Sequence, residues 1–562
     1  MTELDALRRS LTAPGMPFEM VERDLGGRRV RTWRHAPESL RALVLDSREF
    51  GGRDFIRYQD ERLSYAEHFA AVATFAHRLA ERGVAPGDRV ALAMRNYPEW
   101  SVAFFAAASL GAVAVPLNAW WTAGELEFAL RDSGSSVLVA DGRRAELLGA
   151  IPADLGIDLV VVRPEGPLPA GAADWDAVLG AIPADAALPD AEVGPDDLAT
   201  LFYTSGTTGR PKGAVGTHRN ICTNPVSVAY GAALGALRGG TPLEEALAPQ
   251  PERTSLLPVP LFHATGCHSV LVSTFRSGGA LVLMHKWDPA EALRLVERHR
   301  VTHFTGVPTQ LWQMCAHPDL ATRDLSSLRT AGSGGAPAPP HLLTRMVASM
   351  PDRGFSNGYG LTETSSATSI NAAGNYLAKP DSVGPPVAVV DVKVVDAVGE
   401  EVPTGGIGEL WIKGPNVVVG YWNRPDATAE AITPDGWLRS GDLAHLDDEG
   451  FIHVVDRAKD MVIRGGENVY SAEVEAAVFE HPGVRDCAVV GVPHEELGEE
   501  VGVVVQPEPG VELDAEALRR FLGERIAAFK VPAHVWLRTE DFPRNAAGKL
   551  LKRALRDEVV PG

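Results

Sequence analysis

The chain has 562 residues and a formal net charge of −20 at pH 7, from 53 Lys and Arg against 73 Asp and Glu. This length corresponds to roughly three or four folding units. A hydrophobic content of 45% with 22% charged residues is typical of a folded globular protein. The negative charge argues against nucleic acid as a partner, because binding a phosphate backbone requires a basic face. If the substrate is an anion, the cationic side chains that bind it must therefore be concentrated at its binding site.

Cysteine usage and hydropathy indicate the compartment. The four cysteines form no CxxC pair; they are Cys222, Cys267, Cys315 and Cys487. This pattern favours a reducing compartment over a disulfide framework or a thiolate zinc site. The N-terminus carries Glu3 and Asp5 instead of the apolar stretch of a signal peptide. The longest apolar run, 102–117, is too short to span a bilayer. We therefore expect a cytoplasmic protein without an integral membrane segment.

The first third of the chain alternates between helix and strand patterns. Predicted helices cover 64–82, 99–110 and 122–131, and predicted strands cover 89–94, 112–115 and 137–140. Gly83 is placed to end the first helix. Alternation of this kind indicates an α/β fold with parallel strands. Residues 150–197 and 231–253 are expected to be a loose peripheral connection and an exposed insertion, respectively.

The last third of the chain changes character twice. Short β-like runs separated by turns fill residues 387–419 and indicate a small antiparallel sheet or barrel. After Asp456 a new α+β pattern begins, with helices near 473–479 and 514–526 and strands near 487–490 and 502–505. The predicted fold class is therefore α/β: a large N-terminal domain, 1–456, built of α/β sheets plus a small β-barrel, and a small α+β C-terminal domain, 457–562.

The sharpest motif is YTSGTTGRPKG at residues 203–213, which follows a predicted strand at 198–203. Glycines allow backbone N–H groups to turn toward an anion, hydroxyl side chains add donors, and Lys212 adds charge. The spacing of a Walker A loop is absent. The motif therefore predicts a polyphosphate-binding loop of another kind.

This motif resembles the phosphate-binding signature of the adenylate-forming superfamily, which includes acyl-CoA synthetases, luciferase-like enzymes and peptide-synthetase adenylation domains. Further motifs resemble those of the same superfamily, in the same order, at 261–266, 333–337, 357–364, 437–442, 456–460, 465–468 and 543–549. The resemblance runs from about residue 40 to the end of the chain. It implies ATP, Mg²⁺ and coenzyme A as co-substrates and cofactors.

Single residues in these motifs suit the implied roles. Tyr359 offers an aromatic face on which a purine can stack. Glu363 is a hard oxygen ligand suited to Mg²⁺. Asp442 can accept hydrogen bonds from both ribose hydroxyls, and Arg457 is expected at the same sugar. By resemblance, the ATP- and AMP-binding residues are Thr204, Ser205, Gly206, Thr207, Thr208, Gly209, Lys212, Gly334, Gly335, Ala336, Pro337, Asn357, Gly358, Tyr359, Gly360, Thr362, Asp442 and Arg457.

The resemblance also implies catalytic, coenzyme A and hinge residues. The catalytic residues are Lys549, His263 and Lys212; the CoA-binding residues are Gly465, Gly466 and Asn468; the hinge is Lys459; the metal ligand is Glu363. Lys549 would bridge the substrate carboxylate and the phosphate during adenylation. The C-terminal domain would be mobile, turning about Lys459 to remove Lys549 and present Gly465 and Gly466 to the thiol.

The expected acyl pocket is small and apolar. Its residues are His263, Ala264, Cys267, Gly306, Val307, Pro308, Gly332 and Leu361. None is an obvious ionic partner for a second charged group, so we expect a hydrophobic monocarboxylic acid, fatty or bulky alicyclic, over an amino acid or a diacid. The choice between alkyl and aryl acids stays open.

These observations predict an AMP-forming acid–thiol ligase, an acyl-CoA synthetase of fatty-acid or lipid metabolism. Two alternatives remain: an acyl-AMP ligase that loads a carrier protein, and a non-catalytic nucleotide-binding scaffold. Luciferase-like oxidation would need substrate-specific features that the sequence does not reveal. The expected partners are small molecules, namely the acid, ATP and CoA. The oligomeric state stays open, with a homodimer as one option.

Overall fold

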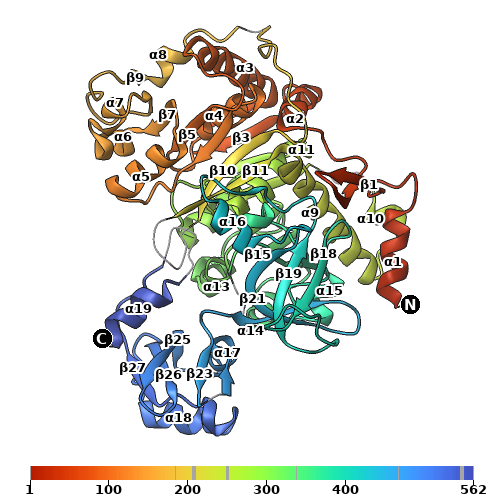
Figure 1. The fold of residues 1–562 in the computed structure, drawn as a ribbon, viewed down its shortest axis with the longest axis vertical. Coiled ribbons are helices and arrows are strands. Elements are labelled where there is room, and N and C mark those ends of the chain that lie inside the picture. The colour runs from red at the N-terminus through yellow and green to blue at the C-terminus, as the bar shows by residue number, and fades with distance from the viewer. Residues whose placement is uncertain are drawn as a thin grey trace. The chain divides into compact units, whose positions relative to one another are not determined.

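The computed structural model describes residues 2–183, 185–204, 211–248, 252–336, 338, 340–465, 467–544 and 550–560, with the backbone alone for 340 and 341. The chain forms two compact units. Unit 1 comprises Met1–Ala338, Leu342–Asp391 and Ile412–Leu438, and unit 2 comprises Pro339–His341, Val392–Trp411 and Arg439–Gly562. The domain boundary predicted at residues 456/457 lies inside unit 2. The division into an N-terminal domain and a mobile C-terminal domain at this point therefore stays a prediction. Figure 1 shows the chain as a ribbon and labels many of its elements.

In the described part of unit 1, the first large sheet has eight strands in the order β20-β11-β10-β6-β5-β7-β8-β9. Its strands are β5 (Arg89–Ala93), β6 (Val113–Pro116), β7 (Val137–Asp141), β8 (Asp158–Val162), β9 (Ala173–Asp174), β10 (Leu198–Thr204), β11 (Lys212–Thr217) and β20 (Gly420–Tyr421). Strands β5 to β9 and the β6–β10 pair are parallel, whereas β10, β11 and β20 pair antiparallel. The predicted parallel α/β fold is confirmed.

Alternate residues of β5 pack against different helices. Val90 and Leu92 belong to the core that contains Phe104, whereas Ala91 and Ala93 belong to the core that contains Leu126. Because side chains alternate across a strand, helices cover both faces of this sheet. The helices around it are α3 (Tyr65–Glu81), α4 (Pro98–Ser109), α5 (Ala123–Ser133), α6 (Gly142–Leu148), α7 (Ile151–Asp154) and α8 (Trp175–Leu179).

The second large sheet of unit 1, again counted over described residues, has eight strands in the order β17-β16-β15-β14-β12-β13-β3-β4. The strands are β3 (Asp54–Tyr58), β4 (Glu61–Ser64), β12 (Thr254–Leu257), β13 (Ala280–Leu283), β14 (His303–Gly306), β15 (Thr330–Gly334), β16 (Gly354–Tyr359) and β17 (Ser369–Ala372). The six strands from β16 to β3 are parallel. The carboxyl ends of β12, β14, β15 and β16 therefore meet at one edge, where α/β sheets bind ligands.

The remaining elements of unit 1 connect and cover these sheets. They are α1 (Glu3–Thr12), β1 (Met20–Leu25), β2 (Arg28–Trp33), α2 (Leu40–Asp46), η1 (Ser47–Phe50), α9 (His218–Arg238), α10 (Leu243–Ala246), the π-helix η2 (Thr265–Val272), α11 (Ser273–Arg276), α12 (Pro289–His299), α13 (Pro308–Ala316), η3 (Pro318–Ala321), α14 (Pro340–Ser349), η4 (Thr362–Thr364), α15 (Gly374–Ala378) and α16 (Pro425–Ala431).

Local sequence signals explain several of these boundaries. Ser64 caps α3: its hydroxyl accepts from the N–H of Glu67, whose carboxylate accepts from the N–H of Ser64 in return. Pro98 occupies the first turn of α4, where the missing N–H costs nothing. Gly134, in the left-handed conformation, ends α5. The predicted helices 64–82, 99–110 and 122–131 are confirmed within two residues at each end.

Two expectations about connections are wrong in part. Residues 150–197 contain β8, a buried parallel strand of the first sheet, so they are not only a peripheral connection. Residues 231–238 are the end of helix α9, not an exposed insertion. Gly231 and Gly235 are buried there, and a Cβ on Gly235 would lie 2.2 Å from the carbonyl oxygen of Ala372. These glycines therefore permit close packing of helix on strand.

Unit 2 is built on two sheets. A four-stranded sheet has the order β18-β19-β21-β22, formed by β18 (Asp391–Val395), β19 (Gly408–Lys413), β21 (Leu438–Leu446) and β22 (Ile452–Arg457), where a small sheet or barrel was expected. The division between the units falls within the first three of these strands. A five-stranded sheet has the order β24-β23-β26-β25, with β27 beside β26. Its elements are β23 (Val462–Arg464), β24 (Glu467–Val469), α17 (Ser471–Phe479), β25 (Val484–His494), β26 (Gly498–Pro507), α18 (Ala515–Gly523), η5 (Ala528–Lys530), β27 (His534–Leu537) and α19 (Lys552–Val559).

The α+β pattern predicted after residue 456 is confirmed by this second sheet and its helices. Their core is rich in valine from β25 and β26, and it packs against Val474 of α17 and Leu518 of α18. Among the described residues of the whole chain, no helix is long and apolar enough to cross a membrane.

Candidate active site

The predicted phosphate-binding loop joins two paired strands. In the β10–β11 hairpin Thr204 lies opposite Lys212, and the Thr204 hydroxyl donates to the carbonyl oxygen of Lys212 at 3.3 Å. The predicted residues Ser205, Gly206, Thr207, Thr208 and Gly209 lie outside the described residues. The hairpin fixes both ends of the segment that contains them.

Lys212 and Glu363, predicted to contact phosphate and metal, share a neighbour in Tyr421. The Lys212 ammonium lies 5.2 Å from the centroid of the Tyr421 ring, within the range of a cation–π interaction. The Tyr421 hydroxyl donates to Oε1 of Glu363 at 2.6 Å. Burial, together with the nearby Glu363 carboxylate, raises the pKa of Tyr421, so the phenol stays protonated and a donor.

Backbone pairing fixes this arrangement. Tyr421 lies opposite Ala214 in the β11–β20 pair, and the N–H of Trp422 donates to the carbonyl of Gly213 at 2.8 Å. The N–H of Val418 donates to the carbonyl of Glu363 at 2.9 Å. Tyr421 is absent from the predicted site, because it lies about two hundred residues beyond the phosphate motif in a two-residue strand that no periodicity reveals.

Glu363 fits a magnesium ion carried by a nucleotide. Glu363 is half-buried, and one of its carboxylate oxygens accepts a hydrogen bond from Tyr421. Mg²⁺ commonly takes one or two carboxylates, substrate phosphates and several waters. Among described residues no group of three or more His, Cys, Asp or Glu forms a metal cage. The donor set therefore suits Mg²⁺ bound together with ATP.

The motifs predicted to lie beside the adenine occupy adjacent strand ends. Ser333 pairs with Gly306 of β14 on one side and with Asn357 of β16 on the other, and the Ser333 hydroxyl donates to Oδ1 of Asn357 at 3.2 Å. In the same ladder Gly334 lies opposite Gly358. Gly335 and Ala336 follow at the end of β15, whereas Pro337 lies outside the described residues. The structure thus brings together motifs that are more than twenty residues apart.

A tight turn holds Tyr359 and Glu363 in place. A Cβ on Gly360 would lie 1.4 Å from the carbonyl oxygen of Ser366, so only glycine fits there. The N–H of Thr368 donates to the carbonyl of Tyr359 at 2.8 Å. The carbonyl of Ser365 accepts from the Asn224 amide and contacts Nδ1 of His268 at 3.1 Å. Thr362, Glu363 and Thr364 form η4 within this turn.

The predicted acyl-pocket residues follow the ends of neighbouring strands. His263 lies beyond β12, and Val307 and Pro308 lie directly after β14, the strand paired with β12. The Gln310 amide donates to the carbonyl of Pro258 at 3.4 Å and so joins the two segments. Leu361 and His263 are half-buried; the buried members are Ala264, Cys267, Gly306, Val307, Pro308 and Gly332.

His263 is neutral at physiological pH. Burial lowers its pKa to about 4, and its Nε2 is a buried atom without a hydrogen-bond partner among described residues. The carbonyl of His263 accepts from the N–H of Cys267 at 2.9 Å, at the start of the π-helix η2. Single turns of π-helix occur often at functional sites. The imidazole can orient a substrate by a hydrogen bond but is not a cation there.

The other predicted residues belong to unit 2. Asp442, on β21, is 2% exposed, and its Oδ1 lies 2.9 Å from Nε of Arg457 on the paired strand β22. The structure therefore brings together the two residues predicted at the ribose. Lys459 is exposed in the turn after β22. Gly465, with φ of 59°, lies between β23 and β24, and Asn468 is exposed on β24. Gly466 and Lys549 lie outside the described residues.

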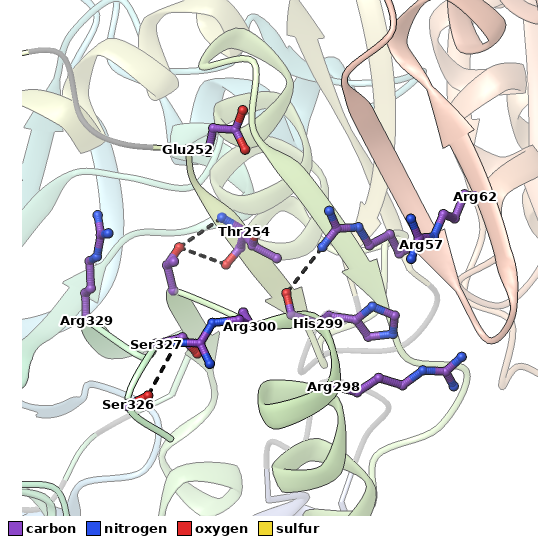
Figure 2. A pocket seen from close by; sticks show the side chains of 11 residues that line it. Arg57, Arg62, Glu252, Thr254, Arg298, His299, Arg300, Ser326, Ser327 and Arg329 are labelled. Carbon is purple, nitrogen blue, oxygen red and sulfur yellow. Dashed lines mark hydrogen bonds between the residues drawn. The ribbon is translucent and has the colours of Figure 1, made fainter. Parts of the chain in front are cut away.

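A cationic cavity of about 540 Å³ lies elsewhere in unit 1. Figure 2 shows it around Thr254, at the beginning of β12, with Arg57 donating to the carbonyl of His299. This is the amino edge of the second sheet, opposite the strand ends described above. Most of its guanidinium groups already have carboxylate partners: Arg57 with Asp54 at 3.0 Å, Arg298 with Asp60 at 2.7 Å and Arg300 with Asp324 at 3.3 Å. We therefore do not assign it to the active site.

The fold and the site define an adenylate-forming enzyme. Residues 45–422 match the family of AMP-binding enzymes, and residues 473–549 match the C-terminal domain of AMP-binding enzymes. The chain therefore belongs to the AMP-binding enzyme family, within the adenylate-forming superfamily that its motifs resemble.

Known relatives match nearly the whole chain. A protein named feruloyl-CoA synthase from Amycolatopsis sp is 41% identical over 503 residues, covering 89% of this chain and 95% of that protein. Long-chain-fatty-acid–CoA ligase FadD13 from Mycobacterium tuberculosis is 35% identical, covering 89% of this chain and 93% of that protein. The structure of ATP-bound MatB from Rhodopseudomonas palustris matches with a TM-score of 0.81 at 32% identity, covering 92% of this chain and 98% of that chain.

Proposed function

We propose that the protein is an acid–thiol ligase that adenylates a hydrophobic monocarboxylic acid with Mg-ATP and transfers the acyl group to coenzyme A. The observation that carries this proposal is the Lys212–Tyr421–Glu363 arrangement at the base of the phosphate loop. It supplies a cation and a metal-binding carboxylate to one polyphosphate. Lys212, Glu363, Asp442 and Lys549 all stand at the positions that the family motifs give them, which argues against a non-catalytic scaffold.

In the first half-reaction a carboxylate oxygen of the acid attacks the α-phosphorus of ATP. The bond from that phosphorus to the β-bridging oxygen breaks, and pyrophosphate leaves with the electron pair. Negative charge grows on the phosphoryl oxygens, and cations placed near them lower the barrier. Lys212 would neutralise this charge, and Glu363 would hold the magnesium that accompanies the nucleotide. Lys549, by family resemblance, would bridge the carboxylate and the phosphate.

In the second half-reaction the thiol sulfur of coenzyme A attacks the acyl carbon. The thiol proton passes to solvent, the bond from the acyl carbon to the AMP oxygen breaks, and AMP leaves with that electron pair. We propose that rotation about Lys459 replaces Lys549 by Gly465 and Gly466 between the two steps. The positive φ of Gly465 and its lack of a side chain support close passage of a narrow pantetheine arm. The domain boundary at residues 456/457 belongs to this proposal.

For the acid, we propose an aryl-bearing monocarboxylate. The sequence indicated a hydrophobic acid, and the 41% identity to a feruloyl-CoA synthase favours an aromatic one. The pocket residues Ala264, Cys267 and Val307 are buried and carry no charged group, which agrees with an apolar acyl group. The 35% identity to FadD13 supports a long-chain fatty acid as the second candidate. The cytoplasmic location stays a prediction.

The test is AMP and acyl-CoA formation, followed by mass spectrometry, with Mg-ATP and a panel of acids. The panel contains hydroxycinnamic acids, benzoic acids, short to long fatty acids and alicyclic acids, each with and without CoA. We expect acyl-CoA from an aryl acid, and loss of acyl-AMP formation in Lys549→Ala. Acyl-AMP that accumulates regardless of CoA would contradict the CoA-ligase assignment and favour a carrier-protein acceptor. ATP binding without AMP from any acid would favour the scaffold.

A further inference from the structure

The segment that carries Lys549 begins and ends at one place in unit 2. Arg544 and Leu550, which flank residues 545–549, form an antiparallel bridge. The N–H of Leu551 donates to the carbonyl of Pro543 at 2.8 Å. Residues 545–549 themselves lie outside the described residues, and this base is the described point at which they join unit 2.

Each side of the base has an ionic anchor. Before the segment, the Arg544 guanidinium pairs with Asp486 of β25. After it, the Lys552 ammonium lies 2.7 Å from Oε1 of Glu475 in α17. The Lys552 and Glu475 side chains are only 20% and 19% exposed. Oε1 of Glu475 also accepts from the N–H of Val489 at 2.8 Å. The second anchor therefore joins the base to α17 and β25 together.

The second anchor continues to the predicted hinge. Lys552 donates to the Ser471 hydroxyl at 2.8 Å, and that hydroxyl donates to Oδ1 of Asp456 at 3.0 Å. The other oxygen of Asp456 accepts from the N–H of Ser471. Asp456 is buried at the end of β22, three residues before Lys459. A continuous polar path thus links the strand before the hinge with the residue three positions after Lys549.

This path is not needed to dock helix α19. Leu555 is fully buried and packs with Ala488, Val504 and Phe542, so an apolar contact already holds α19 on the sheet. Buried ion pairs contribute little net stability, because desolvation offsets their attraction. What such a pair supplies is a defined geometry, since both groups must meet to satisfy each other.

We propose that Lys552, Glu475, Ser471 and Asp456 form a positioning brace that fixes the Lys549 segment relative to the hinge. The brace serves adenylation, the step in which Lys549 must reach the reacting phosphate, and it rests on the role of Lys549 in the proposed function. None of the four residues contacts substrate in this proposal. They act through Lys549, whose displacement by even 1 Å can cost about 100-fold in rate.

Helix α17 offers a matched control. Glu473 and Glu475 are two residues apart, so their side chains leave the helix in different directions. Glu473 pairs with Lys530 of η5 at 2.7 Å, with Lys530 19% exposed. Lys530→Met therefore removes a similar ion pair from the same helix and leaves the brace intact.

The experiment compares Lys552→Met, Lys552→Arg and Lys530→Met in the full chain. Two half-reactions are measured: acyl-AMP formation from acid and Mg-ATP, and acyl-CoA formation from synthetic acyl-AMP. We expect Lys552→Met to lower kcat of the first step about tenfold or more, with KM for ATP changed less than about twofold. The second step should change less than about twofold. Lys552→Arg should recover the first step, and Lys530→Met should match the wild type.

Hydrogen exchange of the peptide spanning residues 540–556 provides a readout independent of activity. The brace predicts faster exchange in Lys552→Met than in the wild type and no change in Lys530→Met. Should Lys552→Met fold poorly, Ser471→Ala removes the hydroxyl that joins Lys552 to Asp456 and is expected to give the same two results. Unchanged exchange, or equal loss of both half-reactions, would overturn the brace. A wild type without acyl-AMP formation would instead overturn the proposed function, and the exchange result would still decide whether the brace restrains the segment.

Discussion

The Tyr421 hydroxyl donates to Glu363 at 2.6 Å while the same ring lies 5.2 Å from the Lys212 ammonium. One side chain thus contacts both of the charged groups proposed to bind the polyphosphate. We expect this shared contact to hold the two groups in place for Mg-ATP.

The Tyr421→Phe change keeps the ring but removes the hydrogen bond to Glu363. A lost hydrogen bond to a charged group costs about 1.5–3 kcal/mol, so we expect KM for Mg-ATP to rise about tenfold. Steady-state kinetics of pyrophosphate release checks this. The control is Tyr65→Phe, which removes a phenol hydrogen-bonded to the carbonyl of Gly279 at 2.8 Å, outside the nucleotide motifs. Equal KM values for the two variants would contradict the role of Tyr421.

The Glu363→Gln change removes the proposed metal ligand but keeps an oxygen that can accept from Tyr421. We expect kcat to fall about 100-fold, comparable to the loss of one transition-state contact, and the Mg²⁺ concentration for half-maximal activity to rise. Binding of ATP without Mg²⁺ should be unaffected. Titration of Mg²⁺ at fixed ATP gives the first result, and calorimetry with EDTA gives the second. A variant with unchanged Mg²⁺ dependence would place the metal elsewhere.

Much of the fold could be predicted because the local signals agree. Ser64 with Glu67, Pro98 and Gly134 mark helix ends, and alternating strands and helices identify a parallel sheet. The motifs at Ser333 and Asn357 are assigned to one site by family resemblance, and the structure places them on the paired strands β15 and β16. Local pattern was enough for the helix ends and the parallel sheet, whereas the site motifs needed the resemblance.

Tyr421 and the end of α9 could not be predicted, for a different reason. Tyr421 lies in a two-residue strand that pairs with β11. This pairing depends on contacts between segments that are distant in sequence, which local patterns do not reveal. Gly231 and Gly235 indicated a loop from composition, yet they are buried where α9 packs closely against β17. In both cases the decisive contact lies more than one hundred residues away in sequence.

Buried histidines predict loss of stability below pH 6.5. Burial lowers the pKa of His68 to about 3 and those of His218 and His268 to about 4, from 6.5. Between pH 6.5 and 4 the unfolded chain binds protons that the folded chain does not. As the pH decreases through this range, the free energy of unfolding therefore decreases by about 1.4 kcal/mol per pH unit for each such histidine. Urea unfolding at pH 7.0, 6.0 and 5.0 measures the slope.

A single substitution separates the contribution of one histidine. His68 is enclosed by the rings of Phe55, Phe105 and Phe275, and its Nε2 contacts the Ser101 hydroxyl at 2.9 Å. We expect His68→Gln to reduce the slope by about 1.4 kcal/mol per pH unit, because the amide does not titrate. The exposed His35 provides the control, and His35→Gln should leave the slope unchanged. Equal slopes in all three proteins would refute the assignment.

The neutral state of His263 predicts the pH profile of adenylation. With a pKa of about 4, His263 stays uncharged above pH 5.5. We expect His263→Gln, which can still donate a hydrogen bond, to lower kcat while leaving the shape of the profile between pH 6 and 9 unchanged. Rates of acyl-AMP formation across this range provide the measurement. An ionisation near pH 6.5 that disappears in the variant would show that His263 acts as an acid or a base.

Gly360 allows the turn that holds Tyr359 and Glu363, so its replacement should disable nucleotide binding. A Cβ there would lie 1.4 Å from the carbonyl of Ser366, which is backbone and cannot move aside cheaply. We expect Gly360→Ala to lower the free energy of unfolding by about 2 kcal/mol or more and to weaken ATP binding, measured by denaturation and calorimetry. Gly124, within α5, has no atom within 4 Å of its Cβ position. Gly124→Ala should therefore stabilise the chain by about 0.5–1 kcal/mol and bind ATP normally. If Gly360→Ala also bound ATP normally, the geometry of this turn would not control the nucleotide site.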